Sequence, residues 1–324
     1  MTLLEDLFKD KGTVKKRDPF DPEASAQALH DAFKGLGTDE KVIIDILGSH
    51  TNAQRQEIKR KYKTMFGTDL LVDLEGELGG HFLETCLALM CPSHLYDAHC
   101  LRKAMKGLGT DEKCLIEILC SRTNSELELI KEAYYGEFRH LLDEDLESDT
   151  SSDFRKLLRS LLNAGREENA ETDSKLAMQD AMRLLAEGQG RWGTGESAFN
   201  HILCLRSVAQ LRLTFQAYRK KAGMTIEQAI RKEFSGDMKE GLLAIIQVAK
   251  NAPEFFADRL YSAMRGAGTD DDTLIRIIVS RSEIDLQLIK DEYQRKYKKS
   301  LTKAVKDDCS GDYCRLLLKV IGEA

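Results

Sequence analysis

An internal repeat constrains the fold of this chain more than any other feature of its sequence. The segment KGLGTDEK occurs at residues 34–41 and again, letter for letter, at 106–113. Weaker copies, GRWGTGE and RGAGTDD, lie at 190–196 and 265–271. The glycine before the threonine is separated from the next such glycine by 72, 84 and 75 residues, at Gly37, Gly109, Gly193 and Gly268. A recurrence with this period predicts four copies of one unit of about 70 residues, whereas length alone suggests about two domains.

The residues around each copy are typical of α-helices. Thr-Asp-Glu after the second glycine predicts the N-terminus of a helix, because a carboxylate there accepts from unpaired backbone N–H groups. The residues that follow are apolar at the i, i+3, i+4 spacing of one buried helix face, for example at 42–47 and 274–278. No stretch shows the alternation of a strand. The sequence therefore predicts an all-α fold with about five helices per repeat.

The predicted boundaries follow from the repeat and from one polar insertion. The stretch NAGREENAETD lies in the longest interval between copies and is predicted to be a linker. We predict these segments: an N-terminal tail at 1–20, repeat I at 21–91, repeat II at 92–163, a linker at 164–174, repeat III at 175–250 and repeat IV at 251–324.

The net charge limits the partners of the chain. Its 324 residues carry a formal net charge of −6, which disfavours binding to nucleic acid or to anionic lipid by charge alone. Binding to a negative surface would need a bridging cation. No apolar run reaches the roughly 18 residues of a membrane span, and MTLLEDLFKD at the start lacks the pattern of a signal peptide. We therefore expect a cytoplasmic protein, with unconventional secretion left open.

The eight cysteines include no C-x-x-C pair. A cluster of histidines and cysteines between residues 81 and 100 admits a zinc site as one alternative. The paired ligand spacings of structural zinc sites are missing, however, and Cys86 and Cys91 lie in the apolar run FLETCLALMC. Reduced thiols packed in a helical core are the simpler expectation.

The glycine loops carry the chemistry that recurs. A loop between two helices exposes carbonyl oxygens that lack a partner within the helix, and such oxygens are hard ligands suited to Ca²⁺. A calcium site also needs a carboxylate, and one recurs 40 residues after each second glycine: Glu77, Asp149, Glu233 and Asp308. A phosphate-binding P-loop, a dinucleotide-binding fingerprint and an EF-hand all fail on residue pattern. A purely structural helix cap remains the plainer alternative, but it does not explain the matched acids.

The glycine-threonine loop, the distant acid, the Arg-Ser or Arg-Thr step that ends the second helix and the fourfold count together resemble the annexins. The resemblance covers essentially the whole chain after about Phe20. It implies a curved disc of four five-helix repeats in a right-handed superhelix, with calcium loops on the convex face. It also implies reversible, calcium-dependent binding to anionic phospholipid.

The resemblance further implies which residues bind the ions. Backbone carbonyls of the loops and the distant acid would form one main Ca²⁺ site per repeat: Phe33, Gly35, Gly37 and Glu77; Met105, Gly107, Gly109 and Asp149; Gly188, Arg191, Gly193 and Glu233; Met264, Gly266, Gly268 and Asp308. Weaker accessory sites would use Thr38 with Glu40 and Thr110 with Glu112. Residues expected to touch lipid headgroups are Lys34, Lys106, Arg191, Trp192 and Arg265, for which solvated charge or partial burial is the alternative.

We expect a peripheral, calcium-regulated membrane protein without enzymatic activity, because no catalytic arrangement of side chains recurs with the repeats. Its expected partner is a membrane with phosphatidylserine-like headgroups, on which self-association is a further expectation; nucleic acid is not an expected partner. The alternative is a helical-repeat scaffold that acts mainly through a protein partner of the tail. In the tail, Leu3, Leu4, Leu7 and Phe8 would share one face of a helix.

Overall fold

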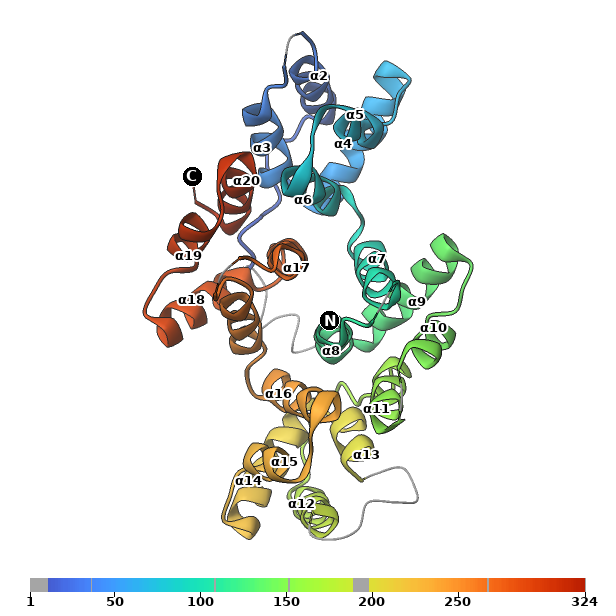
Figure 1. Ribbon diagram of the computed structural model, residues 1–324, viewed down its shortest axis with the longest axis vertical. Coiled ribbons are helices and arrows are strands. Elements are labelled where there is room, and N and C mark those ends of the chain that lie inside the picture. The colour runs from blue at the N-terminus through green and yellow to red at the C-terminus, as the bar shows by residue number, and fades with distance from the viewer. Residues whose placement is uncertain are drawn as a thin grey trace. The chain divides into compact units, whose positions relative to one another are not determined.

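The computed structural model describes residues 11–35, 37–107, 109–150, 152–188, 198–266 and 268–323 (Figure 1). These residues form nineteen helices, and no strand occurs among them. The longest helix, α16 (Gly236–Ala263), contains a non-helical residue, Asn251. The Asn251 side chain accepts a hydrogen bond from the N–H of Glu254 at 3.2 Å, so it caps a new helix, and Pro253 in the first turn fits that start. With α16 counted as two helices, each repeat has five, and the predicted all-α fold is confirmed.

The helices have the following bounds. Repeat I contains α2 (Pro22–Ala32), α3 (Glu40–Ser49), α4 (Asn52–Phe66), α5 (Leu70–Glu77) and α6 (Gly80–Met90). Repeat II contains α7 (Ser93–Met105), α8 (Glu112–Ser121), α9 (Asn124–Phe138), α10 (Leu142–Asp149) and α11 (Ser152–Leu162). Repeat III contains α12 (Ser174–Gly188), α13 (Ala198–Leu205), α14 (Val208–Ala222), α15 (Ile226–Glu233) and the first part of α16. Repeat IV contains the second part of α16, α17 (Asp271–Arg281), α18 (Leu286–Tyr297), α19 (Leu301–Asp308) and α20 (Gly311–Ile321).

The second helix of each repeat buries an apolar face, as its apolar pattern predicts. Ile43 and Leu47 of α3 and Leu274, Ile277 and Ile278 of α17 are fully buried. Covering such a stripe from both sides stabilises each repeat by about 1.5–3 kcal/mol for every side chain taken out of water.

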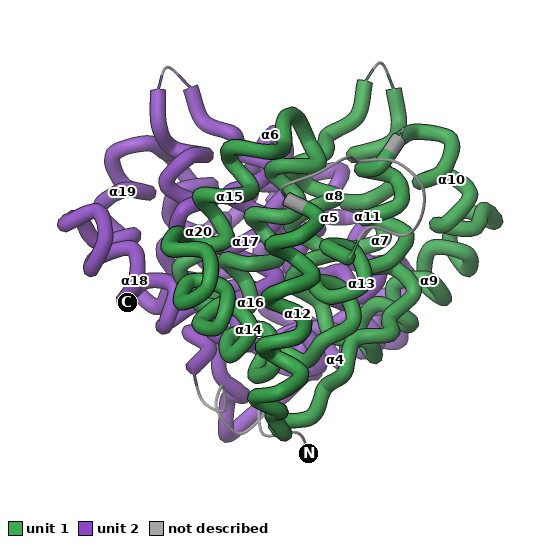
Figure 2. The backbone as a smooth tube through the Cα atoms, turned by 90° about the horizontal axis from the view of Figure 1, so that it is seen from below, with its two compact units in different colours: residues 1–3, 97–255 green, residues 4–96, 256–324 purple. Residues whose placement is uncertain are grey.

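The chain divides into two compact units (Figure 2). Among the described residues, the continuous unit contains 97–255 and the discontinuous unit contains 11–96 together with 256–323. In the discontinuous unit α3 packs on α20, and α6 packs on both α17 and α20. In the continuous unit α12 packs on α14, and α11 packs on α8 and α13.

Residues 11–17, which we call the strap, are part of the discontinuous unit rather than a free tail. The N–H groups of Thr13 and Val14 donate to the Ser282 carbonyl at 2.7 and 3.0 Å, and the Thr13 hydroxyl donates to the Val320 carbonyl at 2.6 Å. At its other end the strap binds repeat I through Arg17, whose backbone N–H and carbonyl pair with the Gln54 amide at 3.0 and 2.9 Å. The predicted apolar face of Leu3, Leu4, Leu7 and Phe8 lies outside the described residues.

The polar linker is a structural element of the continuous unit. The Arg166 guanidinium donates to the carbonyls of Leu203 and Arg206, each at 2.8 Å. Further along, the backbone N–H and carbonyl of Asp173 pair with the Gln210 amide at 2.8 and 2.9 Å. This repeats the pairing of Arg17 with Gln54, so the strap and the linker enter repeats I and III in the same way.

None of the eight cysteines, all of which the structure describes, forms a disulfide bond, and Cys86 is fully buried. Within the described ranges, no three His, Cys, Asp or Glu side chains are placed to hold a metal ion together.

Candidate functional site

Each glycine loop joins the first helix of a repeat to the second, and the structure describes three of the four loops apart from one residue in each. Both glycines of these loops have positive φ, between 94° and 122°: Gly35, Gly37, Gly107, Gly109, Gly266 and Gly268. A Cβ atom placed on any of them would meet nothing within 4 Å. Backbone conformation, and not lack of space, therefore explains why glycine occupies these positions.

The three loops close through the same backbone hydrogen bond. The N–H of Asp39 donates to the Ala32 carbonyl at 2.9 Å, and Asp111 and Asp270 make the equivalent bond at 2.8 Å. The side chain of each aspartate then accepts from the backbone N–H three residues later and caps the second helix. The N-terminal signal in Thr-Asp-Glu was therefore interpreted correctly, with the aspartate as the capping residue.

The acid that recurs 40 residues later occupies one structural position in all four repeats. Glu77, Asp149, Glu233 and Asp308 are each the last residue of the fourth helix. In every case the chain leaves the helix in an extended conformation immediately afterwards. The constant offset in the sequence thus corresponds to a constant place in the fold.

The threonine of the loop contacts this acid directly. The hydroxyls of Thr38, Thr110 and Thr269 donate to the carboxylates of Glu77, Asp149 and Asp308 at 3.0, 2.7 and 2.5 Å. The structure therefore brings the loop and the acid together in repeats I, II and IV. Sequence reasoning assigned Thr38 and Thr110 only to accessory sites and missed this contact. The fixed interval between threonine and acid was the available signal.

The electrostatic environment of these acids is unfavourable without a cation. A helix C-terminus carries partial negative charge from unpaired carbonyls, so a carboxylate there is repelled. Among the described residues, no lysine, arginine or histidine forms an ion pair with Glu77, Asp149, Glu233 or Asp308. In repeats I, II and IV a carboxylate, a helix end and a glycine loop thus converge. Basic residues lie in the last turn of α15 (Arg231 and Lys232) and of α19 (Lys306), but among the described residues none of them pairs with the acid.

The third site is described only in part. Glu233 ends α15 and is exposed, and Gly188 ends α12. Arg191, Trp192 and Gly193 lie outside the described residues, so the predicted loop carbonyls and the predicted membrane contact of Trp192 stay predictions.

The basic residues that flank the described loops are exposed, and two of them have local partners. Lys34 pairs with Asp31 at 2.9 Å, and the guanidinium of Arg265 lies 5.9 Å from the centre of the Tyr261 ring. Lys106 is exposed. Glu40 and Glu112, predicted for accessory sites, lie in the first turn of α3 and α8.

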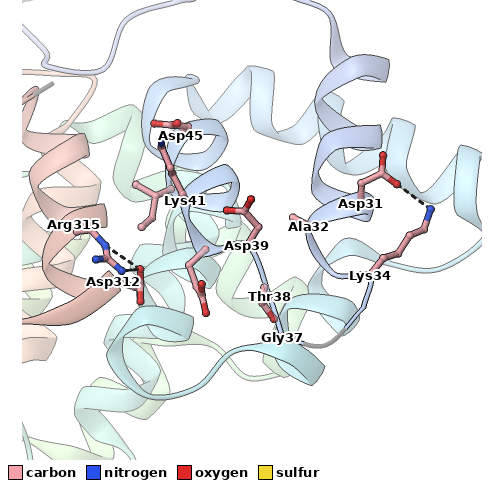
Figure 3. Close-up of a pocket in the computed structure, with 12 residues that line it drawn as sticks. Asp31, Ala32, Lys34, Gly37, Thr38, Asp39, Lys41, Asp45, Asp312 and Arg315 are labelled. Atoms are coloured by element: carbon pink, nitrogen blue, oxygen red, sulfur yellow. Dashed lines mark hydrogen bonds and ion pairs between the residues drawn. The ribbon is translucent and has the colours of Figure 1, made fainter.

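A broad cavity of about 850 Å³ lies beside the loop of repeat I (Figure 3). Thr38 and Asp39 of the loop line one side, and Asp312 and Arg315 of α20, which pair with each other, line another. This surface could not be predicted from the sequence, because its two sides come from the first and the last repeat.

His81 links repeats I and IV close to this surface. Its two ring nitrogens lie 2.8 Å from Glu84 and 3.2 Å from Asp271, and Asp271 also accepts from the Tyr313 hydroxyl at 2.8 Å. The hydrogen bond with Glu84, aided by the charge of Asp271, raises the pKa of His81 above its ordinary value. Asp271 follows the glycine loop of repeat IV, and His81 follows the acid of repeat I, so this cluster joins two candidate sites.

Comparison with known proteins places these features in a family context. Residues 24–89, 96–161, 179–245 and 255–320 match the sequence profile of the family described as Annexin. Human annexin A11 is 50% identical over 315 residues, which are 97% of this chain and 62% of annexin A11. The structure of annexin III is similar with a TM-score of 0.94 and 46% identity, covering 96% of this chain and 97% of that one. The structure of calcium-bound annexin (Sm)1 is similar with a TM-score of 0.87 and 36% identity, covering 96% of this chain and 93% of that one.

In the described part of the chain, none of the helices combines the length and the apolar character needed to cross a bilayer.

Proposed function

Because the chain belongs to the annexin family, known for Ca²⁺-dependent phospholipid binding, we propose that it binds anionic phospholipid membranes reversibly through calcium ions. The ions would lie between the glycine loops and the acids that end the fourth helices. The proposal includes a cytoplasmic protein that reaches membranes when calcium rises and that carries out no catalytic reaction.

One observation supports this proposal most directly. In repeats I, II and IV the loop threonine donates a hydrogen bond to the distant acid, so residues 39 positions apart form one local site. The acid has no cationic partner among the described residues and lies at the negative end of a helix. Such a site favours a cation, and its oxygen donors suit a hard one.

The residues proposed to hold calcium combine neutral and charged oxygens. The carbonyls are those of Phe33, Gly35 and Gly37 in repeat I, of Met105, Gly107 and Gly109 in repeat II, of Gly188, Arg191 and Gly193 in repeat III and of Met264, Gly266 and Gly268 in repeat IV. The carboxylates are those of Glu77, Asp149, Glu233 and Asp308. A calcium ion held by three carbonyls and one carboxylate keeps a positive charge and open positions for a phosphate or carboxylate oxygen of a headgroup. The annexin (Sm)1 structure, which is calcium-bound, supports calcium as the ion.

The charge of the chain explains why calcium would control binding. A net charge of −6 is repelled by an anionic membrane, and Lys34, Lys106 and Arg265 near the loops are too few to reverse this. Each ion adds positive charge at the place of contact. Four weak sites that engage one membrane together bind far more tightly than one site alone.

The alternative, a scaffold that acts through a protein partner of the tail, predicts a different dependence on calcium. Its contacts would involve residues 1–10 and would not require the acids. Self-association on the membrane is compatible with either function and forms a separate part of the proposal.

Sedimentation with phosphatidylserine vesicles tests the proposal. We expect the protein to pellet with vesicles in calcium and to stay in the supernatant when calcium is chelated. Absent or calcium-independent pelleting would contradict the proposal and favour the scaffold.

A charge-matched pair of variants locates the site. We expect the chain with Glu77→Gln, Asp149→Asn, Glu233→Gln and Asp308→Asn to keep its helical content and lose vesicle binding. The control changes four exposed acids outside the sites: Glu57→Gln, Glu132→Gln, Glu144→Gln and Glu171→Gln. The site variant and the control variant change the net charge by the same amount. If only the site variant loses vesicle binding, the binding depends on the proposed sites. If the site variant still binds vesicles, the proposed sites are rejected.

A further inference from the structure

We propose that the threonine hydroxyl of the glycine loop in repeats I, II and IV is a positioning group that holds the distant carboxylate in place before calcium arrives. It thereby lowers the calcium concentration at which the site fills. This inference rests on the proposed function of the loops as calcium sites.

The same contact with the carboxylate recurs wherever the structure describes it. Thr38, Thr110 and Thr269 each use the hydroxyl to reach one carboxylate oxygen of the acid, Oε2 of Glu77 or Oδ2 of Asp149 and Asp308. The Thr110 hydroxyl also lies 3.2 Å from the backbone carbonyl oxygen of Asp149. All three threonines are half-buried. The separation of 39 residues is the same in each case, although residues between the loop and the acid differ.

The donor is held rigidly. Each threonine lies between a glycine of fixed positive φ and an aspartate whose N–H closes the loop and whose side chain caps the next helix. Threonine is also branched at Cβ, which restricts its χ1 angle. The hydroxyl therefore points from a fixed backbone, whereas among the described residues the acid at the end of the short fourth helix accepts no side-chain hydrogen bond other than that of the threonine.

The chemistry of a hydroxyl suits this role better than that of a cationic donor. An ammonium or guanidinium group would neutralise the carboxylate and compete with calcium. A hydroxyl orders the carboxylate without removing its charge. It occupies one oxygen, and among the described residues no side chain donates a hydrogen bond to the other oxygen of Glu77, Asp149 or Asp308.

Two other roles for the threonine make different predictions. If the hydroxyl only fastened the loop to the fourth helix, its removal would lower the stability of the calcium-free protein and leave calcium affinity unchanged. If its contact with the acid opposed calcium binding, its removal would tighten binding. A positioning role predicts weaker calcium binding with calcium-free stability nearly unchanged, and serine should replace threonine.

The test uses a parent chain that carries Glu233→Gln, because Thr194 of the third loop is not described. Thr38→Val, Thr110→Val and Thr269→Val are combined in this parent, and the matching triple change to serine keeps the hydroxyls. The control is Thr64→Val, Thr172→Val and Thr302→Val, since none of these threonines donates to a carboxylate. The measurements are the calcium concentration for half-maximal binding to phosphatidylserine vesicles and the melting temperature in a calcium chelator.

We expect the valine variant to need roughly two- to twelvefold more calcium for half-maximal binding. This range corresponds to the free-energy cost of immobilising one side chain when the ion binds. The serine variant and the control should stay within about twofold of the parent by the same estimate. An unchanged or lower calcium requirement in the valine variant, or failure of serine to restore the parent value, overturns the inference.

A graded comparison provides a second readout without membranes. In two chains that keep a single described acid, Glu77 or Asp149, the rise of melting temperature with calcium reports calcium binding. Thr38→Val should shift this dependence more than Thr110→Val, because Glu77 has one more rotatable bond than Asp149 and is more exposed. These single substitutions also test the inference if the triple valine variant does not fold. Equal shifts for the two substitutions, or a larger shift for Thr110→Val, contradict the inference.

Failure of the proposed function gives a distinct result. If the parent does not bind vesicles in a calcium-dependent way, the calcium sites themselves are wrong. If the parent binds and the acid variant does not, but the valine variant equals the parent, only the role of the threonine is rejected.

Discussion

Gly12→Ala tests whether the strap is a structural part of the discontinuous unit. A Cβ atom at this position would lie 2.6 Å from the Glu283 carbonyl carbon and 2.7 Å from the Ser282 carbonyl oxygen. Both are backbone atoms, so no side-chain rotation can relieve the contact. Gly12 has no positive φ, and the effect of the substitution therefore comes from packing alone.

The expected loss of stability is about 1–3 kcal/mol, the usual range for adding a methyl group to a well-packed position. The strap must move away from repeat IV to admit the methyl group. This movement weakens the hydrogen bonds from Thr13 and Val14 to Ser282, and it exposes Val14, which is 5% exposed in the structure. The loss of stability cannot exceed the loss caused by complete release of the strap, in which the released residues regain conformational entropy.

The free energy of unfolding measured in urea by circular dichroism provides the assay. Gly136→Ala is the matched control, because Gly136 lies inside α9 and a Cβ atom there meets nothing within 4 Å. Alanine should stabilise that helix by about 0.5–1 kcal/mol. The two identical substitutions are thus predicted to change stability in opposite directions.

Equal stability of the Gly12→Ala variant and the parent would refute the reasoning. It would mean that the strap detaches from repeat IV without consequence, so that residues 11–17 do not contribute to the stability of the discontinuous unit. Destabilisation by both substitutions would instead indicate a general intolerance of added volume.

Two further predictions concern charged pairs. The imidazolium form of His81 binds Glu84 and Asp271 more strongly than neutral imidazole does. The stability that depends on His81 should therefore be fully present below the ordinary histidine pKa and be lost as pH rises through the raised pKa. The urea midpoint should accordingly fall between pH 5.5 and 8.5 in the parent, and it should fall less steeply in His81→Gln. The buried Arg122 guanidinium donates two hydrogen bonds to Asp97, at 2.6 and 2.8 Å. Asp97→Asn removes the charge of this partner and should destabilise the protein by about 3–5 kcal/mol. A free energy of unfolding within experimental error of that of the parent would show that the ion pair is not needed for stability.

Features that recur along the chain were predictable from the sequence. The fourfold count, the five helices of each repeat and the helix starts at Asp39, Asp111 and Asp270 all depend on local residue patterns. The pairing of loop and acid was accessible for the same reason, because a long-range contact that recurs along the chain leaves a constant interval in the sequence. Its observed form, through Thr38 and its equivalents, was not anticipated, since a hydrogen bond between side chains has no period of its own.

Contacts that occur once could not be predicted in this way. The bonds from Thr13 to Ser282 and Val320 join residues 269 and 307 positions apart, and nothing in the sequence marks these partners. Residues 11–17 were therefore interpreted as part of the N-terminal tail, and residues 164–174 as a linker without contacts of their own being predicted. A closer comparison of repeats I and III could have indicated these contacts, because Gln54 and Gln210 occupy matching positions. Each accepts a hydrogen bond from the backbone of the segment that precedes its repeat.

The division of the chain into a continuous and a discontinuous unit has a consequence for protein synthesis. All residues of the continuous unit have been synthesised once residue 255 has left the ribosome. Repeat I is made earlier, yet the carbonyls that the strap binds belong to residues near the end of the chain. At about 5–20 residues per second, repeat I waits several seconds after the middle of the protein is complete. The order of completion is therefore middle first and ends last, and α3 and α6 wait for α17 and α20, on which they pack, until the last repeat has been made.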